Sequence, residues 1–273
     1  MSVKVSVIMG IYNCADTLCE AIDSILAQTY TDWELIMCDD GSSDETLRIA
    51  HDYRDRYPDR ILVLTNERNL GLNKTLNHCL AYAKGEYIAR MDGDDISVPE
   101  RLEKEVAFLD SNPAYAIVSC PMIYFDENGD WGQGRSIAFP EKGNFVKGTP
   151  FCHAPCMVRA DAYKTVGGYS EDRRTLRVED YHLWFCMYAA GYRGANLSEP
   201  LYKMRDDENA YSRRKFRFAW NEAYVRLTGY RMLALPFRNY VYVLRPILVN
   251  LLPKGLYRFL HHKKQAATAQ KAR

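Results

Sequence analysis

A cluster of acidic residues ends one of the apolar runs of this sequence and offers the clearest chemistry in it. The run "EYIARM" at 86–91 is followed directly by Asp92, Gly93, Asp94 and Asp95. Three neighbouring carboxylates repel one another unless a cation lies among them, and a glycine leaves room for that ion to approach. Aspartate is also common in turns, and Asp95 could have only a structural role in such a turn. We interpret the cluster as a site for a divalent metal.

A calcium-binding EF-hand is the obvious rival, because Asp92, Asp94 and Glu103 match positions 1, 3 and 12 of its loop. The match fails because Ile96 replaces a ligand and Ser97 replaces the required glycine. A site with few protein carboxylates suits Mg²⁺ or Mn²⁺, whose open positions phosphate oxygens typically fill. The cluster therefore predicts a phosphorylated ligand. The usual glycine-rich phosphate loops are missing, which argues against a dinucleotide dehydrogenase and a P-loop NTPase.

Short apolar runs alternate with helical patterns through the first part of the chain. Strands are predicted at 3–9, 33–38, 60–65, 86–91 and 115–120, separated by segments in which apolar residues recur at helical spacing. This alternation favours an α/β fold with a mainly parallel central sheet flanked by helices. Ligands of such sheets lie at the carboxyl ends of the strands. Asp39 and Asp40, which follow the second strand, should therefore share an edge of the sheet with the first acidic cluster.

Local signals predict where some of the helices begin and end. Ser42 and Glu45 have the spacing of a capping box for the helix after the second strand. Gly85 follows a helical run and is placed to end it as the C′ residue. Ser97, with Pro99 shortly after it, predicts the start of the next helix.

Composition and cysteine usage narrow the class of protein. Hydrophobic residues make up 47% of the chain and charged residues 26%, which is typical of a folded domain and excludes disorder. The first residues lack the basic and long apolar segments of a secretory signal, so we expect a cytoplasmic protein. The eight cysteines read as reduced core thiols. "CHAPC" at 152–156 has no second cysteine or histidine pair at zinc spacing.

Several stretches, taken in order, resemble the family 2 glycosyltransferases of GT-A fold. They are "VSVIMGIYNCADTLCEAIDSILAQTYTDWELIMCDDGSSDET", "NLGLNKTLNHCLAYAKGEYIARMDGDD", "GGY" and "VEDYHLW", and the resemblance covers about residues 3 to 205. It implies a single GT-A type catalytic domain at 1–215. It also implies an inverting, metal-dependent transfer of a sugar from a nucleoside diphosphate donor, which we expect to be a UDP-sugar.

The resemblance also assigns roles to individual positions. Tyr12 would contact the base of the nucleotide, and Asp40 would contact the edge of that base. Asp92 would lie at the ribose and at the metal, and Asp94 would bind the metal, Mn²⁺ or Mg²⁺. Lys74 is a weaker match as a phosphate contact and could equally be a solvated helix residue.

Inversion needs a carboxylate on the acceptor side of the sugar to take the proton of the attacking hydroxyl. "VEDYHLW" supplies Glu179 and Asp180 in the first turn of a predicted helix. Such a pair could merely complement the helix dipole. The resemblance instead assigns Asp180 as the general base and Glu179 as acceptor orienter or alternative base. Arg177 could reach a diphosphate, although a solvated surface position is the simpler account.

The C-terminal part at 216–273 is predicted to be a helical tail of unusual charge. From Ala223 onward it holds ten Lys or Arg and no Asp or Glu. Its apolar stretch is interrupted by Arg245 and Pro246 well before the roughly 20 residues that a spanning helix needs. The tail could pack on the catalytic domain as a helix pair, or lie as an interfacial segment on anionic lipid at the inner face of the membrane. We favour the interface.

Together these features predict transfer of a hexose-type sugar to a glycan or lipid-linked acceptor in cell-surface polysaccharide or lipopolysaccharide-type biosynthesis. Where processive relatives carry Q-x-x-R-W, this chain has "ENAYSRRKFRFAW", which favours one sugar per encounter. Two other classes stay open: a sugar-phosphate nucleotidyltransferase and a non-catalytic module that binds nucleotide sugars. We expect no nucleic acid among the partners.

Overall fold

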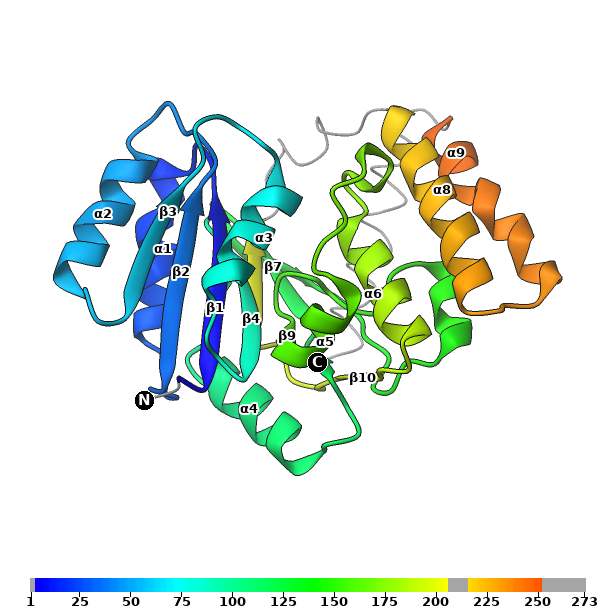
Figure 1. The fold of residues 1–273 in the computed structure, drawn as a ribbon, viewed down its shortest axis with the longest axis horizontal. Helices are drawn as coiled ribbons and strands as arrows, with labels where there is room; N and C mark the ends of the chain where they lie inside the picture. Colours follow the sequence, from blue (N-terminus) through cyan, green and yellow to red (C-terminus); the bar gives the residue numbers. More distant parts are fainter. Residues whose placement is uncertain (1–2, 206–215, 252–273) are drawn as a thin grey trace.

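A seven-stranded sheet runs through the centre of the protein in the computed structural model, which describes residues 3–205 and 216–251 (Figure 1). Its order is β10-β6-β9-β4-β1-β2-β3. The strands are β1 (Val5–Ile11), β2 (Trp33–Asp39), β3 (Ile61–Thr65), β4 (Tyr87–Asp92), β6 (Ile117–Ser119), β9 (Met157–Arg159) and β10 (Gly194–Asn196). Only β9 pairs antiparallel with its neighbours. The expected mainly parallel α/β fold is confirmed.

Helices cover both faces of this sheet, so its central strands are buried on both sides. One face packs against α1 (Ala15–Leu26), α2 (Thr46–Arg56) and α4 (Arg101–Ser111). The other packs against α3 (Leu72–Tyr82), α5 (Ala160–Val166) and α6 (Glu179–Ala189). Short 3₁₀ helices, η1 (Lys142–Lys147) and η2 (Arg173–Thr175), lie in the connections.

A second, four-stranded sheet has the order β5-β11-β7-β8. It comprises β5 (Ile96–Ser97), β7 (Met122–Asp126), β8 (Gly129–Gln133) and β11 (Tyr202–Arg205). β5 follows the acidic cluster directly and pairs antiparallel with β11, which places Tyr202 opposite Ser97. The small sheet therefore fixes the segment that leaves the cluster.

The register of the large sheet brings the two acidic segments to one edge. Gly10 near the end of β1 pairs with Asp92 of β4 on one side, and Ile11 pairs with Asp39 of β2 on the other. All three strands run parallel, so their carboxyl ends meet there. The expectation that both acidic segments share an edge is confirmed.

Three predicted helix boundaries are wrong, each because a tertiary contact uses the residue differently. α2 begins at Thr46 without a capping box, and the Ser42 hydroxyl instead accepts a hydrogen bond from the Asn13 N–H at 3.0 Å. Ser97 lies in β5, and α4 begins at Arg101. α3 already ends at Tyr82, and Gly85 serves close packing, since a Cβ there would lie 2.4 Å from the Ser6 nitrogen.

The described part of the tail forms α8 (Phe216–Met232), η3 (Phe237–Leu244) and α9 (Arg245–Asn250). α8 packs against α6 so closely that a Cβ on Gly229 would lie 2.3 Å from the ring of Phe185. The inner face of this segment is thus joined to the catalytic domain. Within the described ranges, none of the helices has the length and apolar character needed to cross a membrane. Residues 252–273 of the predicted tail lie outside the described residues, and the division at 215 and 216 stays a prediction.

Candidate active site

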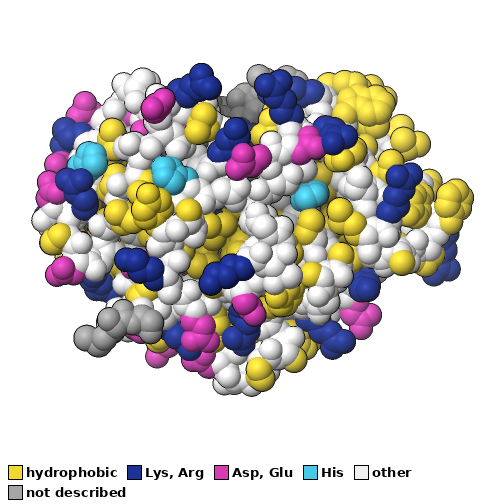
Figure 2. All heavy atoms as spheres, viewed as in Figure 1, with side chains coloured by type: hydrophobic (Ala, Val, Ile, Leu, Met, Phe, Trp, Pro, Cys, Tyr) yellow, Lys and Arg dark blue, Asp and Glu magenta, His cyan; other side chains and the backbone are white. Residues whose placement is uncertain are grey.

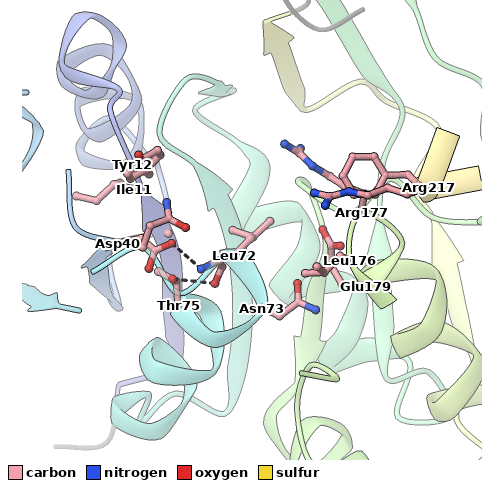
Figure 3. Close-up of a pocket in the computed structure, with 14 residues that line it drawn as sticks. Ile11, Tyr12, Asp40, Leu72, Asn73, Thr75, Leu176, Arg177, Glu179 and Arg217 are labelled. Carbon is pink, nitrogen blue, oxygen red and sulfur yellow. Dashed lines mark hydrogen bonds between the residues drawn. The ribbon is translucent and has the colours of Figure 1, made fainter. Parts of the chain in front are cut away.

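A cleft of about 520 Å³ opens at the carboxyl edge of the large sheet, between two walls (Figure 3). One wall comes from the ends of β1 and β2 and the start of α3, and the other from the segment before α6 and from α8. The first wall includes Ile11, Tyr12, Asp40, Leu72, Asn73 and Thr75, and the second includes Leu176, Arg177, Glu179 and Arg217. Three predicted site residues, Tyr12, Asp40 and Glu179, are therefore brought together.

Asp40 supports the first wall through its own hydrogen bonds. Its Oδ1 accepts from the Asn66 amide at 2.9 Å and from the Leu70 N–H at 2.8 Å, and its Oδ2 accepts from the Gly71 N–H at 2.8 Å. These bonds fix the loop before α3, and Asp40 is nearly buried. Its predicted contact with a base edge stays a prediction.

The sequence predicts that Asp39, directly before it, lies at this edge of the sheet, but assigns it no role of its own. Its Oδ2 accepts hydrogen bonds from the Gly41 and Ser42 N–H groups, while Oδ1 is buried and has no hydrogen-bond partner among residues 3–205 and 216–251. A buried acceptor without a partner is costly unless a ligand supplies the donor. Tyr12, in contrast, is 49% exposed on the same wall and offers its ring to a ligand.

The three acids after β4 form a group with the chemistry of a metal site. One oxygen from each of Asp92, Asp94 and Asp95 lies within 4.8 Å of the others, and no other group of three or more potential ligands occurs in the described residues. Burial, and next the charges of Asp92 and Asp94, raise the pKa of Asp95 well above its usual range. A cation would relieve this repulsion, and oxygen donors of this kind fit Mg²⁺ or Mn²⁺.

We expected Gly93 to leave room for an ion, and the structure shows a packing reason for a glycine at this position. A Cβ on Gly93 would lie 2.9 Å from the sulfur of Cys14, at the start of α1. The residue is therefore explained by close packing of the acidic turn against α1. Asp95 also has a structural partner, because its Oδ1 accepts a hydrogen bond from the Arg205 N–H at 2.9 Å.

Two arginines hold the acidic group from either side. Buried Arg90 on β4 forms an ion pair with Asp92, with 2.6 Å between Nη2 and Oδ1. Arg205 on β11 donates from Nε to the backbone oxygen of Asp94 at 3.0 Å and pairs with Glu20 of α1 at 2.6 Å. The carboxylates are thus oriented before any ligand binds.

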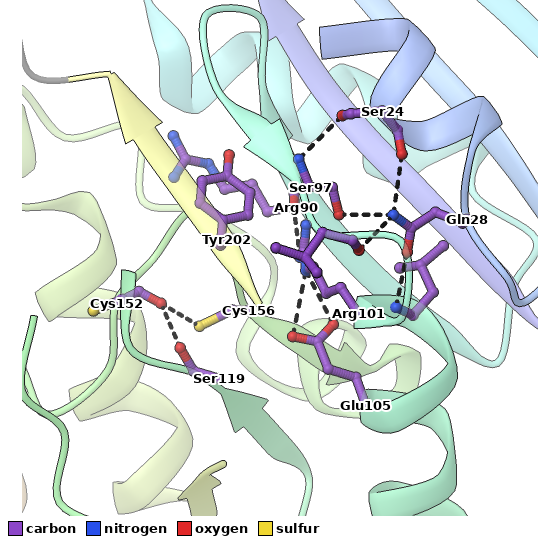
Figure 4. Close-up of polar contacts among 12 residues, drawn as sticks. Ser24, Gln28, Arg90, Ser97, Arg101, Glu105, Ser119, Cys152, Cys156 and Tyr202 are labelled. Carbon is purple, nitrogen blue, oxygen red and sulfur yellow. Dashed lines mark hydrogen bonds and ion pairs between the residues drawn. The ribbon is translucent and has the colours of Figure 1, made fainter. Parts of the chain in front are cut away.

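A buried polar network lies beneath this end of β4 (Figure 4). Arg101 donates to the backbone oxygen of Arg90 at 2.8 Å and forms an ion pair of 3.3 Å with Glu105, and both partners are fully buried. Burial raises the pKa of Glu105 to about 7, although the charge of Arg101 lowers it. Gln28, two residues after the end of α1, joins the network by donating to the Ser97 hydroxyl at 3.1 Å. The network anchors β4 and β5 on both sides of the acidic turn.

The first turn of α6 holds two carboxylates, of which Glu179 belongs to the second wall. Glu179 is buried and lines the cleft, and Asp180 beside it is half-buried. Burial, and next the charge of Glu179, raise the pKa of Asp180 to about 7, while the charge of Arg90 opposes that rise. A carboxylate with such a pKa is well matched to proton transfer near neutral pH.

Two other polar candidates lie away from the cleft. Lys74 does not line it, and its Nζ lies 3.8 Å from Glu171, so its phosphate role stays a prediction. His153 of "CHAPC" is buried and shares a 2.9 Å hydrogen bond with the Tyr169 hydroxyl. Burial, and next the charge of Arg90, lower the pKa of His153 well below its usual range, so the ring is neutral. All eight cysteines are free, as expected.

The second wall also holds two cations: Arg177, for which the sequence left a diphosphate contact open, and Arg217, which the sequence did not mark as functional. The guanidinium groups of Arg177 and Arg217 point into the gap between the walls (Figure 3). Arg177 adopts a left-handed backbone with φ of 69°. Together they place positive charge opposite the first wall.

Comparisons with known proteins show the family of the chain. The sequence model of Glycosyl transferase family 2 matches residues 6–167, and that of Glycosyl transferase family group 2 matches residues 87–261. The chain is 49% identical to a protein of Bacillus subtilis (strain 168) named "Putative glycosyltransferase EpsE", across 96% of this chain and 94% of that protein. It is 32% identical to WfgD of Escherichia coli, named as a UDP-Glc:alpha-D-GlcNAc-diphosphoundecaprenol beta-1,3-glucosyltransferase, across 78% of this chain and 81% of that protein.

Two solved structures share the fold. S. aureus TarS 1-349 in complex with UDP has a TM-score of 0.69 at 22% identity, covering 90% of this chain and 70% of that chain. The mannosyltransferase PcManGT from Pyrobaculum calidifontis, in complex with GDP-Man and Mn²⁺, has a TM-score of 0.65 at 18% identity, covering 96% of this chain and 80% of that chain. At these identities the likeness concerns the fold alone.

Proposed function

Because the chain belongs to glycosyltransferase family 2, we propose that it transfers a hexose-type sugar from a UDP-sugar to a glycan or lipid-linked acceptor. The observation that carries this proposal is the cleft itself. Its first wall offers the exposed ring of Tyr12 and the carboxylate of Asp40, and its second wall offers the carboxylate of Glu179. Asp180, whose pKa is raised to about 7, follows Glu179 directly in the chain. The name of WfgD, which pairs a UDP-sugar with a diphosphoundecaprenol-linked acceptor, supports this choice of donor and acceptor.

The donor would lie between the walls at the carboxyl edge of the sheet. Tyr12 would contact the base, and Asp40 or the unpartnered oxygen of Asp39 would accept a hydrogen bond from its edge. Arg177 and Arg217 would meet the diphosphate from the second wall, where charge-assisted hydrogen bonds to phosphate are strong.

Asp92 and Asp94 are the residues that would hold a divalent metal, Mn²⁺ or Mg²⁺, at this site. When bound, that ion would offset the charge of the diphosphate and of the departing UDP. Arg90 keeps Asp92 oriented through the 2.6 Å ion pair. The closeness of the acidic oxygens and the raised pKa of Asp95 support this assignment.

Asp180 would act as the general base. It takes the proton of an acceptor hydroxyl as that oxygen forms a bond to the anomeric carbon of the sugar. The bond from this carbon to the diphosphate oxygen breaks, and UDP leaves with the electron pair. Attack from the face opposite UDP inverts the anomeric configuration. Glu179, which lines the cleft, would orient the acceptor hydroxyl.

We also propose that one sugar is added per encounter and that the product enters a cell-surface polysaccharide or a lipopolysaccharide-type glycan. The enzyme would work on the cytoplasmic side of the membrane, where a lipid-linked acceptor can reach the cleft. These statements rest on the sequence "ENAYSRRKFRFAW" and on the acceptor named for WfgD.

A thermal-shift panel tests the choice of donor. Ligand that binds the native state raises its melting temperature, so UDP-sugars with Mn²⁺ should raise it more than GDP- or ADP-sugars do. The Asp94→Asn variant should lose the part of the shift that depends on Mn²⁺. Equal shifts with all nucleotide sugars, or a shift with GDP-sugars alone, would contradict the proposed donor.

A further inference from the structure

A row of large apolar side chains lies exposed on the η3–α9 segment. We call it the outer stripe, and its members are Phe237, Val241, Leu244, Leu248 and Leu251. They are between 56% and 87% exposed, whereas hydrophobic side chains on the opposite face of the same segment pack into the protein. An exposed apolar surface of this kind usually marks an interaction site.

The spacing of these residues places most of them on one side of the segment. Val241 and Leu244 are three apart in a 3₁₀ helix, which has three residues per turn, so they align. Leu244, Leu248 and Leu251 follow at steps of four and three, which align on an α-helix. Phe237 lies at the start of η3 and is the most exposed of the five.

The inner face of the segment is held firmly, so the outer stripe is a fixed surface. The ring of Tyr240 packs edge-on against Tyr230 of α8 at 5.8 Å between centroids. Arg245 donates to the backbone oxygen of Lys147 at 3.2 Å, and Pro246 is buried. The stripe therefore cannot turn inward without breaking these contacts.

Positive charge flanks the stripe, and negative charge is absent from this part of the sequence. Arg231, Arg238 and Arg245 are exposed, and the sequence from Ala223 to the C-terminus contains no Asp or Glu. Figure 2 shows hydrophobic side chains gathered at the end of the molecule where α8 and α9 lie, with Lys and Arg among them. Apolar residues mixed with arginines suit the boundary of an anionic bilayer.

The stripe also lies close to the proposed active site. α9 runs beside α8 (Figure 1), and the N-terminal end of α8 supplies Arg217 to the cleft. Phe216 and Trp220, on the same end of α8, are also exposed. A surface held at the stripe would therefore lie near the opening of the cleft.

From these observations we propose that the outer stripe docks on the surface of an anionic phospholipid bilayer and so presents the cleft to a lipid-linked acceptor. The choice of acceptor rests on the proposed function, whereas the docking itself rests on the stripe and its arginines. The outer stripe could instead be covered by a second copy of the chain or by the segment 252–273. The test must distinguish both of these from a bilayer.

The test is co-sedimentation of the full-length protein with vesicles of phosphatidylcholine, alone or mixed equally with phosphatidylglycerol. The protein should bind the mixed vesicles more strongly, and high salt should weaken that binding. Phe237→Ser/Leu248→Ser should lower the partition coefficient about tenfold or more, since two apolar side chains no longer enter the interface. The matched control Ile137→Ser/Phe139→Ser removes two exposed apolar side chains elsewhere and should bind like the wild type.

Melting temperatures and donor binding show whether each variant is still folded and still binds the donor, so that a change in vesicle binding can be assigned to the stripe. Phe237→Ser/Leu248→Ser should keep the wild-type melting temperature and the shift caused by a UDP-sugar with Mn²⁺. If it unfolds, Arg231→Gln/Arg238→Gln tests the same surface and should lower vesicle binding about tenfold. If the wild type binds vesicles but no UDP-sugar, the proposed function fails and the docking stands.

Three results would overturn the proposal. The first is a full-length protein that binds neither kind of vesicle, as expected if 252–273 covers the stripe. The second is a Phe237→Ser/Leu248→Ser variant that binds vesicles as well as the wild type. The third is a dimer by light scattering without lipid that Phe237→Ser/Leu248→Ser dissociates, which would assign the stripe to a second copy.

Discussion

The rate of sugar transfer should depend on pH through the ionisation of Asp180. Burial and the neighbouring Glu179 raise the pKa of this carboxyl from its ordinary 3.8 to about 7. Only the ionised form can accept the proton of the acceptor hydroxyl. Transfer should therefore increase as the pH rises through about 7, and should fall roughly tenfold for each pH unit below that value.

Glu179→Gln provides the sharpest perturbation, because it removes the charge beside Asp180 and keeps the shape of the side chain. A neighbouring carboxylate at the edge of a cleft contributes ~1 kcal/mol, which corresponds to about 0.7 pH units. The acidic limb of the profile should therefore move to lower pH by about that amount. Asp180→Asn should instead lower the rate by about 10²–10⁴ across the whole range while donor binding stays nearly unchanged.

The assay is release of UDP at saturating donor between mildly acidic and mildly alkaline pH, with melting temperatures as the control.

A raised carboxyl pKa disfavours the folded state once the pH exceeds the unfolded value of 3.8, and this penalty is complete above about 7. The two pKa values correspond to ~4 kcal/mol, which solvent screening of a half-buried group reduces to ~2 kcal/mol. Asp180→Asn should thus melt higher than the wild type at alkaline pH and equally at acidic pH. A flat rate profile, or loss of activity in Glu179→Gln but not in Asp180→Asn, would refute the assignment.

Three further predictions concern the acidic group, the network beneath it and the second wall. Asp94→Asn should lower transfer by orders of magnitude with an unchanged melting temperature, and undiminished, metal-independent transfer would contradict the metal assignment. Arg101→Leu leaves Glu105 buried without a partner and should cost ~3–5 kcal/mol in urea unfolding, more than Glu105→Gln does; equal costs would contradict this. Arg217→Gln should weaken UDP binding about tenfold in calorimetry, whereas the control Arg231→Gln should not; equal dissociation constants would remove Arg217 from the site.

The large sheet could be predicted from the sequence because its parallel strands are buried on both faces and read as apolar runs between helices. The small sheet could not, since β5 has only two residues and no period can be recognised over that length. Local capping signals failed at Ser42 and Gly85 for another reason. Contacts with Asn13 and Ser6, which are distant in the sequence, determine what those residues do.

Within the site, the shared edge of Asp40 and Asp92 could be predicted because both residues lie at the ends of parallel strands. The positions of Arg90 and Arg217 could not be predicted. Arg90 lies inside an apolar run, and its charge is explained only by the ion pair with Asp92. Arg217 comes from a basic tail whose charge suggested a membrane, and only the packing of α8 brings it to the cleft. Asp39 looks like a turn residue until one of its oxygens is found buried without a partner.

Product analysis of a single reaction tests the central proposal most directly. The full-length protein would be incubated with a UDP-sugar, a diphosphate-linked lipid acceptor and Mn²⁺, and the products followed by mass spectrometry and proton NMR. We predict one UDP released for each sugar transferred, a glycoside of inverted anomeric configuration, and loss of both products in Asp94→Asn and Asp180→Asn. Release of pyrophosphate, a retained configuration, or equal product from the two variants would contradict the account.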